Sequence, residues 1–235
     1  MKIIKNEKLI RRNGRIGNWT MISALIILGG GMYVSISNSA NPQMFTYSAF
    51  SLIAGFILMQ IAIYMGNRYG RSPRPDEKLD SGLKGLPNEF VMYHYTTPAS
   101  HLLVGPAGVW VILPYHQRGQ VTFKKNRWHI SGGGFLQSYM RIFGQEGLGR
   151  PDLEIDGEIN SLTKYLKKQM DESEIPEIDA MMVFTSDDVE IDAGDATVPA
   201  LKLKQIKEFI RKKSKEKRLS PAVLDKLKSL FDQRL

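Results

Sequence analysis

The sequence predicts an α/β (α+β) protein in which two N-terminal transmembrane helices are followed by a domain with a mixed β-sheet flanked by helices. Two observations lead to this fold class. No Asp, Glu, Lys or Arg occurs between Arg15 and Arg68, although charged residues make up 24% of the 235 residues. After about residue 75, short strand patterns and longer helical patterns follow one another between turn residues.

Two apolar segments in the uncharged stretch are each long enough to cross a bilayer as a helix. They run from Trp19 to Ile36 and from Phe45 to Met65. A hydrocarbon core of about 30 Å needs about 20 helical residues, and a spanning segment must satisfy its own backbone polar groups. The uncharged segment from Asn38 to Pro42 interrupts the pattern, so the two helices are expected to form a hairpin.

Two alternatives exist for an apolar segment in this position. A cleavable signal peptide has a shorter apolar run that ends in small residues, whereas here a second apolar run follows at once. The other alternative is a helical hairpin buried in a soluble protein. We expect a multi-pass protein of the cell membrane, with the lipid bilayer as its first partner.

Basic residues on both sides of the hairpin predict its orientation. Residues 1–18 carry six Lys or Arg and one Glu, and Arg68, Arg71 and Arg74 follow the second span. Lys and Arg resist translocation, so the N- and C-termini are both expected to be cytoplasmic. The chain contains no cysteine, which excludes disulfides and thiolate chemistry.

The composition divides the chain into five parts. These are a basic cytoplasmic N-terminus (1–18), a two-helix transmembrane hairpin (19–66), a linker (67–75), a core (76–200) and basic C-terminal helices (201–235). A globular part of roughly 160 residues is large enough to bury its own hydrophobic core.

Periodicity and turn residues predict the elements of the globular part in order. The predicted elements are a helix over 76–86, strands over 89–95, 100–104, 109–113, 120–123 and 127–130, a helix over 153–170, a strand over 178–184, and helices over 200–213 and 221–231. In the Gly-rich segment 131–151, the apolar face of 135–143 fits either a core-packed turn or a helix lying on the bilayer surface.

The segment ASHLLVGPAGVWVILPYHQRG, Ala99 to Gly119, resembles the nuclease-related domain (NERD) family, a branch of the restriction-endonuclease-like PD-(D/E)xK superfamily. The matching pieces are the strand, Gly-Pro turn and strand from Leu102 to Ile112, the short hairpin that ends at Gly119, and Trp128 in the next strand. The resemblance implies a restriction-endonuclease-like domain that cuts or binds nucleic acid through a divalent metal.

Three positions decide whether the resemblance extends to activity. The family's metal site needs an Asp at the start of one strand and Glu-x-Lys in the next, and these positions fall on Ser100, Leu113 and Tyr115. Their side chains cannot neutralise Mg²⁺, which binds through carboxylates, waters and substrate phosphates. No Asp or Glu occurs from Phe90 to Gln145, so a small shift of the alignment does not restore the site. We therefore predict no catalytic, metal-binding or cofactor-binding residue and no cofactor, which describes a pseudoenzyme.

Other constellations give no stronger site. The four histidines, His94, His101, His116 and His129, have no metal-ligand spacing, and their strand parities argue against a cluster. The acidic stretch 187–195 lacks the spacing of a calcium loop and is interpreted as a solvated turn.

Net positive charge is concentrated at the two ends of the chain. Residues 75–200 carry nineteen acids and eleven bases, whereas residues 201–235 carry twelve bases and four acids. The basic C-terminal helix could contact anionic lipid or nucleic acid, or it could be an ordinary solvated helix face.

Three functions are compatible with these patterns. The leading hypothesis is a membrane-anchored, catalytically inactive nuclease-related domain that acts as a binding or scaffolding module on the cytoplasmic face. The second is an active metal-dependent nuclease whose site lies around Glu77 and Glu154. The third is a structural subunit of a membrane complex, because Gly29, Gly30 and Gly31 would let another membrane protein approach closely.

Overall fold

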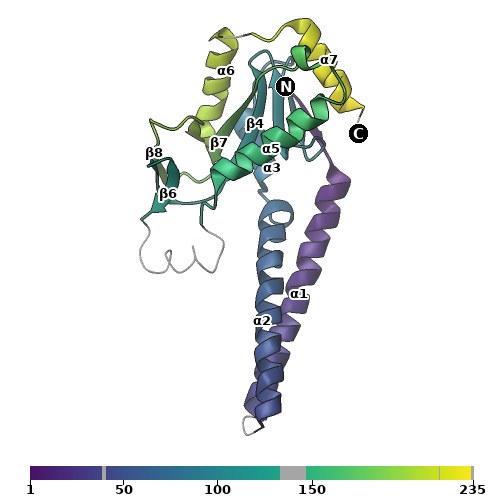
Figure 1. Ribbon diagram of the computed structural model, residues 1–235, viewed down its shortest axis with the longest axis vertical. Coiled ribbons are helices and arrows are strands. Elements are labelled where there is room, and N and C mark those ends of the chain that lie inside the picture. The colour runs from purple at the N-terminus through teal and green to yellow at the C-terminus, as the bar shows by residue number, and fades with distance from the viewer. Residues whose placement is uncertain (39–40, 133–146, 217, 234–235) are drawn as a thin grey trace. The chain divides into compact units, whose positions relative to one another are not determined.

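The computed structural model describes residues 1–38, 41–132, 147–216 and 218–233 (Figure 1). The chain forms two compact units. Glu7–Arg74 makes up a helical hairpin, and Met1–Asn6 together with the described residues from Pro75 onward makes up an α/β domain. The α/β domain is therefore discontinuous in sequence, because the hairpin is inserted after its first six residues.

The hairpin consists of α1 (Glu7–Ser37) and α2 (Pro42–Met65), followed by the short π-helix η1 (Gly66–Gly70). α1 begins well before the predicted Trp19, so one helix of 31 residues includes the basic segment. At 1.5 Å per residue it is about 46 Å long, more than the ~30 Å of a hydrocarbon core. Asn41 caps α2 by accepting a hydrogen bond from the backbone N–H of Gln43 at 3.0 Å.

Small residues spaced seven apart form the seam between α1 and α2. Seven residues make nearly two helical turns, so these residues lie on one side of each helix. Ser48 Oγ donates to the carbonyl of Gly31 at 2.7 Å, and a Cβ added at Gly55 would lie 2.6 Å from Cγ of Leu28. The buried small residues of the seam are Gly17, Ala24, Gly31, Ser48, Gly55 and Ala62. The helices approach closely because a small residue of one helix faces the other along the seam, as Gly55 faces Leu28.

Most large apolar side chains of the hairpin face outward. Trp19, Ile26 and Phe50 are 68%, 69% and 68% exposed. Both helices are long and apolar enough to cross a membrane, and only 11% of each apolar window is buried. This exposure distinguishes them from the core helices of a soluble protein, which are mostly buried.

The α/β domain is built on a six-stranded mixed sheet of order β1-β2-β3-β4-β7-β9. Its strands are β1 (Lys2–Lys5), β2 (Val91–His94), β3 (His101–Gly105), β4 (Gly108–Tyr115), β7 (Ile178–Phe184) and β9 (Ala200–Lys202). β2, β3 and β4 form an antiparallel meander, whereas β1, β7 and β9 join their neighbours in parallel. A second sheet has the order β6 (Arg127–Ser131), β5 (Gly119–Lys124) and β8 (Val189–Asp192).

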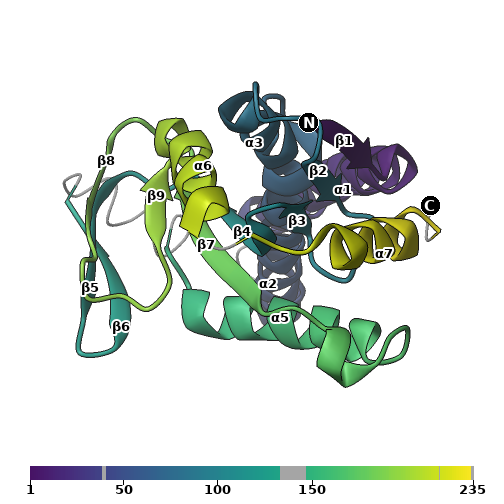
Figure 2. The same ribbon diagram turned by 90° about the horizontal axis from the view of Figure 1, so that it is seen from above.

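Four helices cover the two faces of the six-stranded sheet (Figure 2). α3 (Pro75–Leu83) and α6 (Ile206–Glu216) pack on the face that carries Met92, Leu103 and Ile112. α5 (Pro151–Leu166) and α7 (Pro221–Asp232) pack on the face that carries Leu102 and Val111. Because neighbouring residues of a strand point to opposite faces, each central strand contributes to both cores.

The mixed sheet flanked by helices agrees with the predicted α/β class, and each predicted strand overlaps an observed one. Three strands are not predicted from the sequence, namely β1, β8 and β9. β8 occupies the acidic stretch interpreted as a solvated turn, so that interpretation is wrong for Val189–Asp192. β9 and the 3-10 helix η3 (Leu203–Gln205) take the first residues of the helix predicted over 200–213. The segment 135–143 lies outside the described residues.

Candidate functional site

The three positions assigned from the nuclease resemblance lie together on one face of the sheet. Ser100 stands immediately before β3, and Leu113 and Tyr115 lie in β4. Leu102 pairs with Val111, and continuing this antiparallel register by two residues places Ser100 opposite Leu113. Leu113 and Tyr115 belong to the core that packs against α5. The assigned positions are therefore neighbours, but they carry a hydroxyl, an isobutyl group and a phenol.

Two glutamates of α5 contact this part of the sheet. The hydroxyl of Tyr115 donates to Glu154 Oε2 at 2.9 Å, and the backbone N–H of Ser100 donates to Glu158 Oε2 at 3.3 Å. Glu154 and Glu158 are four residues apart, so they lie on one side of the helix. Both carboxylates thereby contact residues assigned from the nuclease resemblance, Glu154 at Tyr115 and Glu158 at Ser100.

The phenol of Tyr115 stays protonated over the ordinary pH range. Burial raises its pKa first, and the negative charges of Glu154, Glu158 and Asp152 raise it further. The position that the resemblance assigns to a lysine therefore carries a neutral hydrogen-bond donor. Such a donor satisfies one oxygen of Glu154 without adding the positive charge that steadies an attacking water or a leaving group.

Glu77 and Glu154, the carboxylates of the active-nuclease hypothesis, start from helices on opposite faces of the sheet. Glu77 lies on α3, and Glu154 lies on α5. Nothing in the described residues brings the two side chains to one point. Within the part of the chain that the structure describes, no group of three or more His, Asp or Glu side chains is placed to hold a metal ion.

A buried polar cluster lies on the other face of the sheet, between β1, β2, β3 and α3. Lys5 Nζ donates to Asp76 Oδ2 at 2.9 Å and forms a second ion pair with Asp80. Asp80 Oδ1 lies 2.9 Å from His94 Nε2, and His94 Nδ1 lies 2.7 Å from His101 Nδ1. Asp76 and His94 are fully buried, and His101 is 2% exposed. The ammonium of Lys5 lies between two carboxylates and supplies the positive charge that they require.

The pKa of Lys5 reports the balance of forces in this cluster. Burial lowers it, but hydrogen bonds and electrostatic attraction from Asp80 and Asp76 outweigh burial, so the net shift is upward. The lysine therefore remains charged and ties β1 to α3.

Two of the strand histidines lie together as a pair, although the parity argument against a cluster of all four gave no indication of it. His94 and His101 are paired residues of the β2–β3 hairpin. The sequence contains the signal, because the two residues lie symmetrically about the turn centred on Thr97 and Pro98. The predicted strand ends, at residues 95 and 100, already imply this register, but the four histidines were considered as one metal cluster and not as a cross-strand pair.

The basic helix α6 is partly engaged by its own neighbours. Arg211 Nη2 donates to the carbonyl of Gly85 at 3.0 Å, and Lys213 Nζ donates to Glu216 Oε2 at 2.8 Å. Lys213 Nζ also lies 5.8 Å from the ring centroid of Phe209. Lys212, with 78% of its side chain exposed, remains on the solvent side of the helix.

No family model, curated protein sequence or solved structure matches this chain. The function therefore has to be argued from its own residues.

Proposed function

We propose that α1 and α2 anchor the protein in the cell membrane as a two-span hairpin, with both termini in the cytoplasm. The exposed apolar surface of the hairpin supports membrane insertion, because a monomeric soluble protein rarely exposes so many large apolar side chains together. Charged residues are absent from Ile16 to Asn67, so no charge has to be placed in the hydrocarbon core.

The pairing of β1 with β2 supports an even number of membrane crossings. β1 precedes the hairpin and β2 follows it, yet Ile3 pairs with Met92 in one sheet. Two strands can pair only on the same side of a membrane, so the chain between them must return to the side from which it left. Two spans meet this requirement, whereas a single span does not. The basic flanks of both spans favour the cytoplasmic side.

Cysteine labelling tests this topology, because the chain has no cysteine of its own. In Asn38→Cys the thiol lies at the far end of the hairpin, and in Ser229→Cys it lies on the exposed side of α7. A membrane-impermeant maleimide is expected to label Asn38→Cys in intact cells and Ser229→Cys only after permeabilisation. Labelling of Ser229→Cys in intact cells would contradict the proposed orientation.

We further propose that the α/β domain is a catalytically inactive nuclease-related domain that acts as a binding or scaffolding module. The order of its elements supports the resemblance. The turn Gly105 to Gly108 joins β3 and β4, and α6 and α7 end the domain. The hairpin expected to end at Gly119 instead begins there, as β5–β6, and Trp128 lies in β6. The observation that carries the inactive state is the hydrogen bond of Tyr115 to Glu154, because a neutral phenol occupies the position at which an active member needs a charged lysine.

Cleavage assays on the full-length protein in mild detergent test this proposal. We expect no cleavage of DNA or RNA with Mg²⁺ or Mn²⁺. Cleavage by the wild type that disappears in Glu154→Gln, but persists in Asp156→Asn on the exposed side of the same helix, would establish the active-nuclease alternative instead. The Asp156 variant removes one charge from α5 without touching Tyr115, so it controls for nonspecific charge effects and for contaminating nucleases.

A structural role in a membrane complex is supported by one feature of α1. Gly31 packs inside the hairpin seam, whereas a Cβ added at Gly29 or Gly30 would meet nothing within 4 Å. These two glycines leave a shallow place on the outer side of α1 where another helix could approach. If this role is correct, cross-linking from Gly30→Cys in native membranes should capture a second membrane protein. If it is not, the introduced cysteine should react only with lipid-soluble labels and form no cross-link to a protein.

A further inference from the structure

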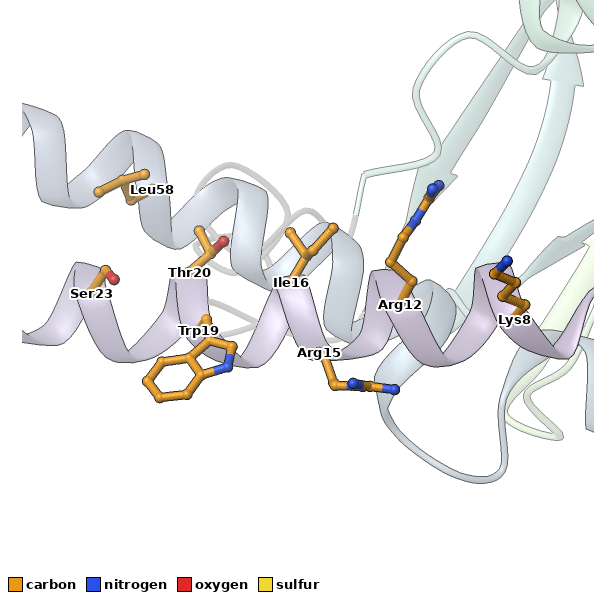
Figure 3. A pocket seen from close by; sticks show the side chains of 8 residues that line it. All are labelled: Lys8, Arg12, Arg15, Ile16, Trp19, Thr20, Ser23 and Leu58. Atoms are coloured by element: carbon orange, nitrogen blue, oxygen red, sulfur yellow. The ribbon is translucent and has the colours of Figure 1, made fainter.

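The hairpin carries a groove that combines positive charge with apolar surface. The groove has a volume of about 660 Å³ and is formed by side chains of α1 with Leu58 of α2 (Figure 3). Figure 3 shows Lys8, Arg12 and Ile16 following one another along α1 at intervals of four residues. This spacing keeps them on one side of the helix. All the lining residues belong to the hairpin, so the groove is a property of that unit alone.

The charges occupy one end of the groove and the apolar groups the other. Lys8, Arg12 and Arg15 are exposed, and they span about 10 Å along the helix axis. Trp19 follows one turn later and is 68% exposed. Polar headgroups occupy roughly 6 Å on each side of a hydrocarbon core, and tryptophan prefers their inner boundary. Arg15 lies about 6 Å along the helix from Trp19 and therefore falls at headgroup depth. Arg12 and Lys8 lie about 10 Å and 16 Å from Trp19, at the membrane surface, where basic residues attract anionic headgroups. In the other direction the groove continues beyond Trp19 into the acyl region.

The hairpin itself carries a single acid. Glu7 is the only acid in the first 75 residues of the chain, and it does not line the groove. Arg12 Nε donates to Asn13 Oδ1 at 3.4 Å, which is a long contact between exposed neighbours. Thr20 and Ser23 add hydroxyl groups below the charges, where ester oxygens of a lipid would lie. Along α1 the groove thus offers cations first and then apolar and hydroxyl side chains together, just as a phospholipid presents its phosphate before its esters and chains.

From this order we infer that the groove binds an anionic phospholipid of the cytoplasmic leaflet, with the phosphate and the headgroup charge at Lys8, Arg12 and Arg15. The inference rests on the proposed membrane anchoring of the hairpin. The volume of the groove suits one lipid headgroup and the upper part of the acyl chains, and it lies in the range of small-molecule sites. A basic pocket between transmembrane helices on the cytoplasmic side is a suitable site for such headgroups.

Lipid binding to the full-length protein in mild detergent tests the inference. Native mass spectrometry with equal amounts of phosphatidylglycerol and phosphatidylcholine should show preferential retention of phosphatidylglycerol. Arg12→Gln and Arg15→Gln should each lower its apparent affinity by ~5-fold, as expected for one charge near a membrane surface. Arg11→Gln is the matched control, because Arg11 carries the same charge next to Arg12 but does not line the groove.

The outcomes separate the groove from other sources of binding. Equal retention of the two lipids, or an equal loss in Arg11→Gln and Arg12→Gln, would overturn the proposed site. The proposed site would also be overturned if glycerophosphate, which has no acyl chains, displaced phosphatidylglycerol as effectively as the lipid itself does, because a lipid site needs the chains. The cysteine labelling described above tests anchoring independently. Correct topology without lipid preference would refute the groove alone.

Discussion

Lys5 is predicted to be the residue of β1 whose loss destabilises the α/β domain most. Lys5→Met removes the ammonium from between Asp76 and Asp80 and takes an ion-pair partner from the fully buried Asp76. Removing one partner of a buried ion pair costs about 3–5 kcal/mol, because the remaining charge is uncompensated. A typical domain has a free energy of unfolding of about 5–15 kcal/mol, so this loss is a large fraction of it.

Urea unfolding of the full-length protein in nonionic detergent measures this effect. Trp110 is 4% exposed, so its emission reports the unfolding of the core, and Trp19→Phe with Trp128→Phe removes the other two tryptophans. With a urea slope of about 2 kcal/mol per molar, Lys5→Met should lower the midpoint by about 1.5–2.5 M.

Lys2→Met provides the matched control in the same strand. Lys2 Nζ lies 3.1 Å from Asp232 Oδ2, but the two side chains are 59% and 38% exposed. An exposed ion pair contributes about 0–1 kcal/mol, so the midpoint should move by less than about 0.5 M. Equal shifts for the two variants would refute the argument, because burial of the ion pair would then have no energetic consequence.

Two further predictions concern pH and the helix seam. Burial raises the pKa of the phenols of Tyr93 and Tyr115, and the neighbouring carboxylates, Asp232 and Glu154 respectively, raise it further. Both phenols therefore stay protonated in the folded protein at a pH at which the same tyrosines ionise in the unfolded chain. Below about pH 10 the two tyrosines do not lower the free energy of unfolding, because they are protonated in both states. Above that pH the unfolded chain ionises and is favoured, so the free energy of unfolding falls. Urea midpoints measured from pH 8 to pH 11 should therefore fall at the alkaline end, less steeply in Tyr115→Phe, and a flat profile would contradict this. In the seam, Gly55→Val should lower the amount of SDS needed to separate α1 from α2, whereas Gly30→Val should change it little, because only Gly55 faces a neighbour within 4 Å. Equal SDS sensitivity of the two variants would rule out the proposed seam.

Periodicity predicted the elements with a strong apolar pattern. The strands around Leu102, Val111 and Met182 are bounded by turn residues and buried on both faces, so they were recognisable from composition alone. The two apolar helices were also recognisable, but not the start of α1, because its first two turns are basic and carry no apolar stretch of spanning length.

The unpredicted elements depend on distant partners. β1 contains two lysines around Ile3 and Ile4, and nothing in so short a segment indicates that Val91–His94 will pair with it. β8 and β9 are similarly short, and each is fixed by a strand far away in sequence. Propensity is a weak guide where tertiary pairing decides.

The candidate sites show the same division. The absence of carboxylates at Ser100, Leu113 and Tyr115 was visible in the sequence, whereas the contacts of Glu154 and Glu158 required the packing of α5 on the sheet. The cluster of Lys5, Asp80 and His94 joins three segments, and only the sheet register brings them together.

The discontinuous sheet imposes an order of events during synthesis. β1 leaves the ribosome first, but its partner β2 is 89 residues later, as the pairing of Lys2 with Val91 shows. At a synthesis rate of about 5–20 residues per second, β1 is made roughly 4–18 s before β2, the strand with which it pairs. Both hydrophobic helices are translated within that interval. A nascent chain whose hairpin stalled in the translocon could not close its sheet, so completion of the domain would report that insertion had succeeded.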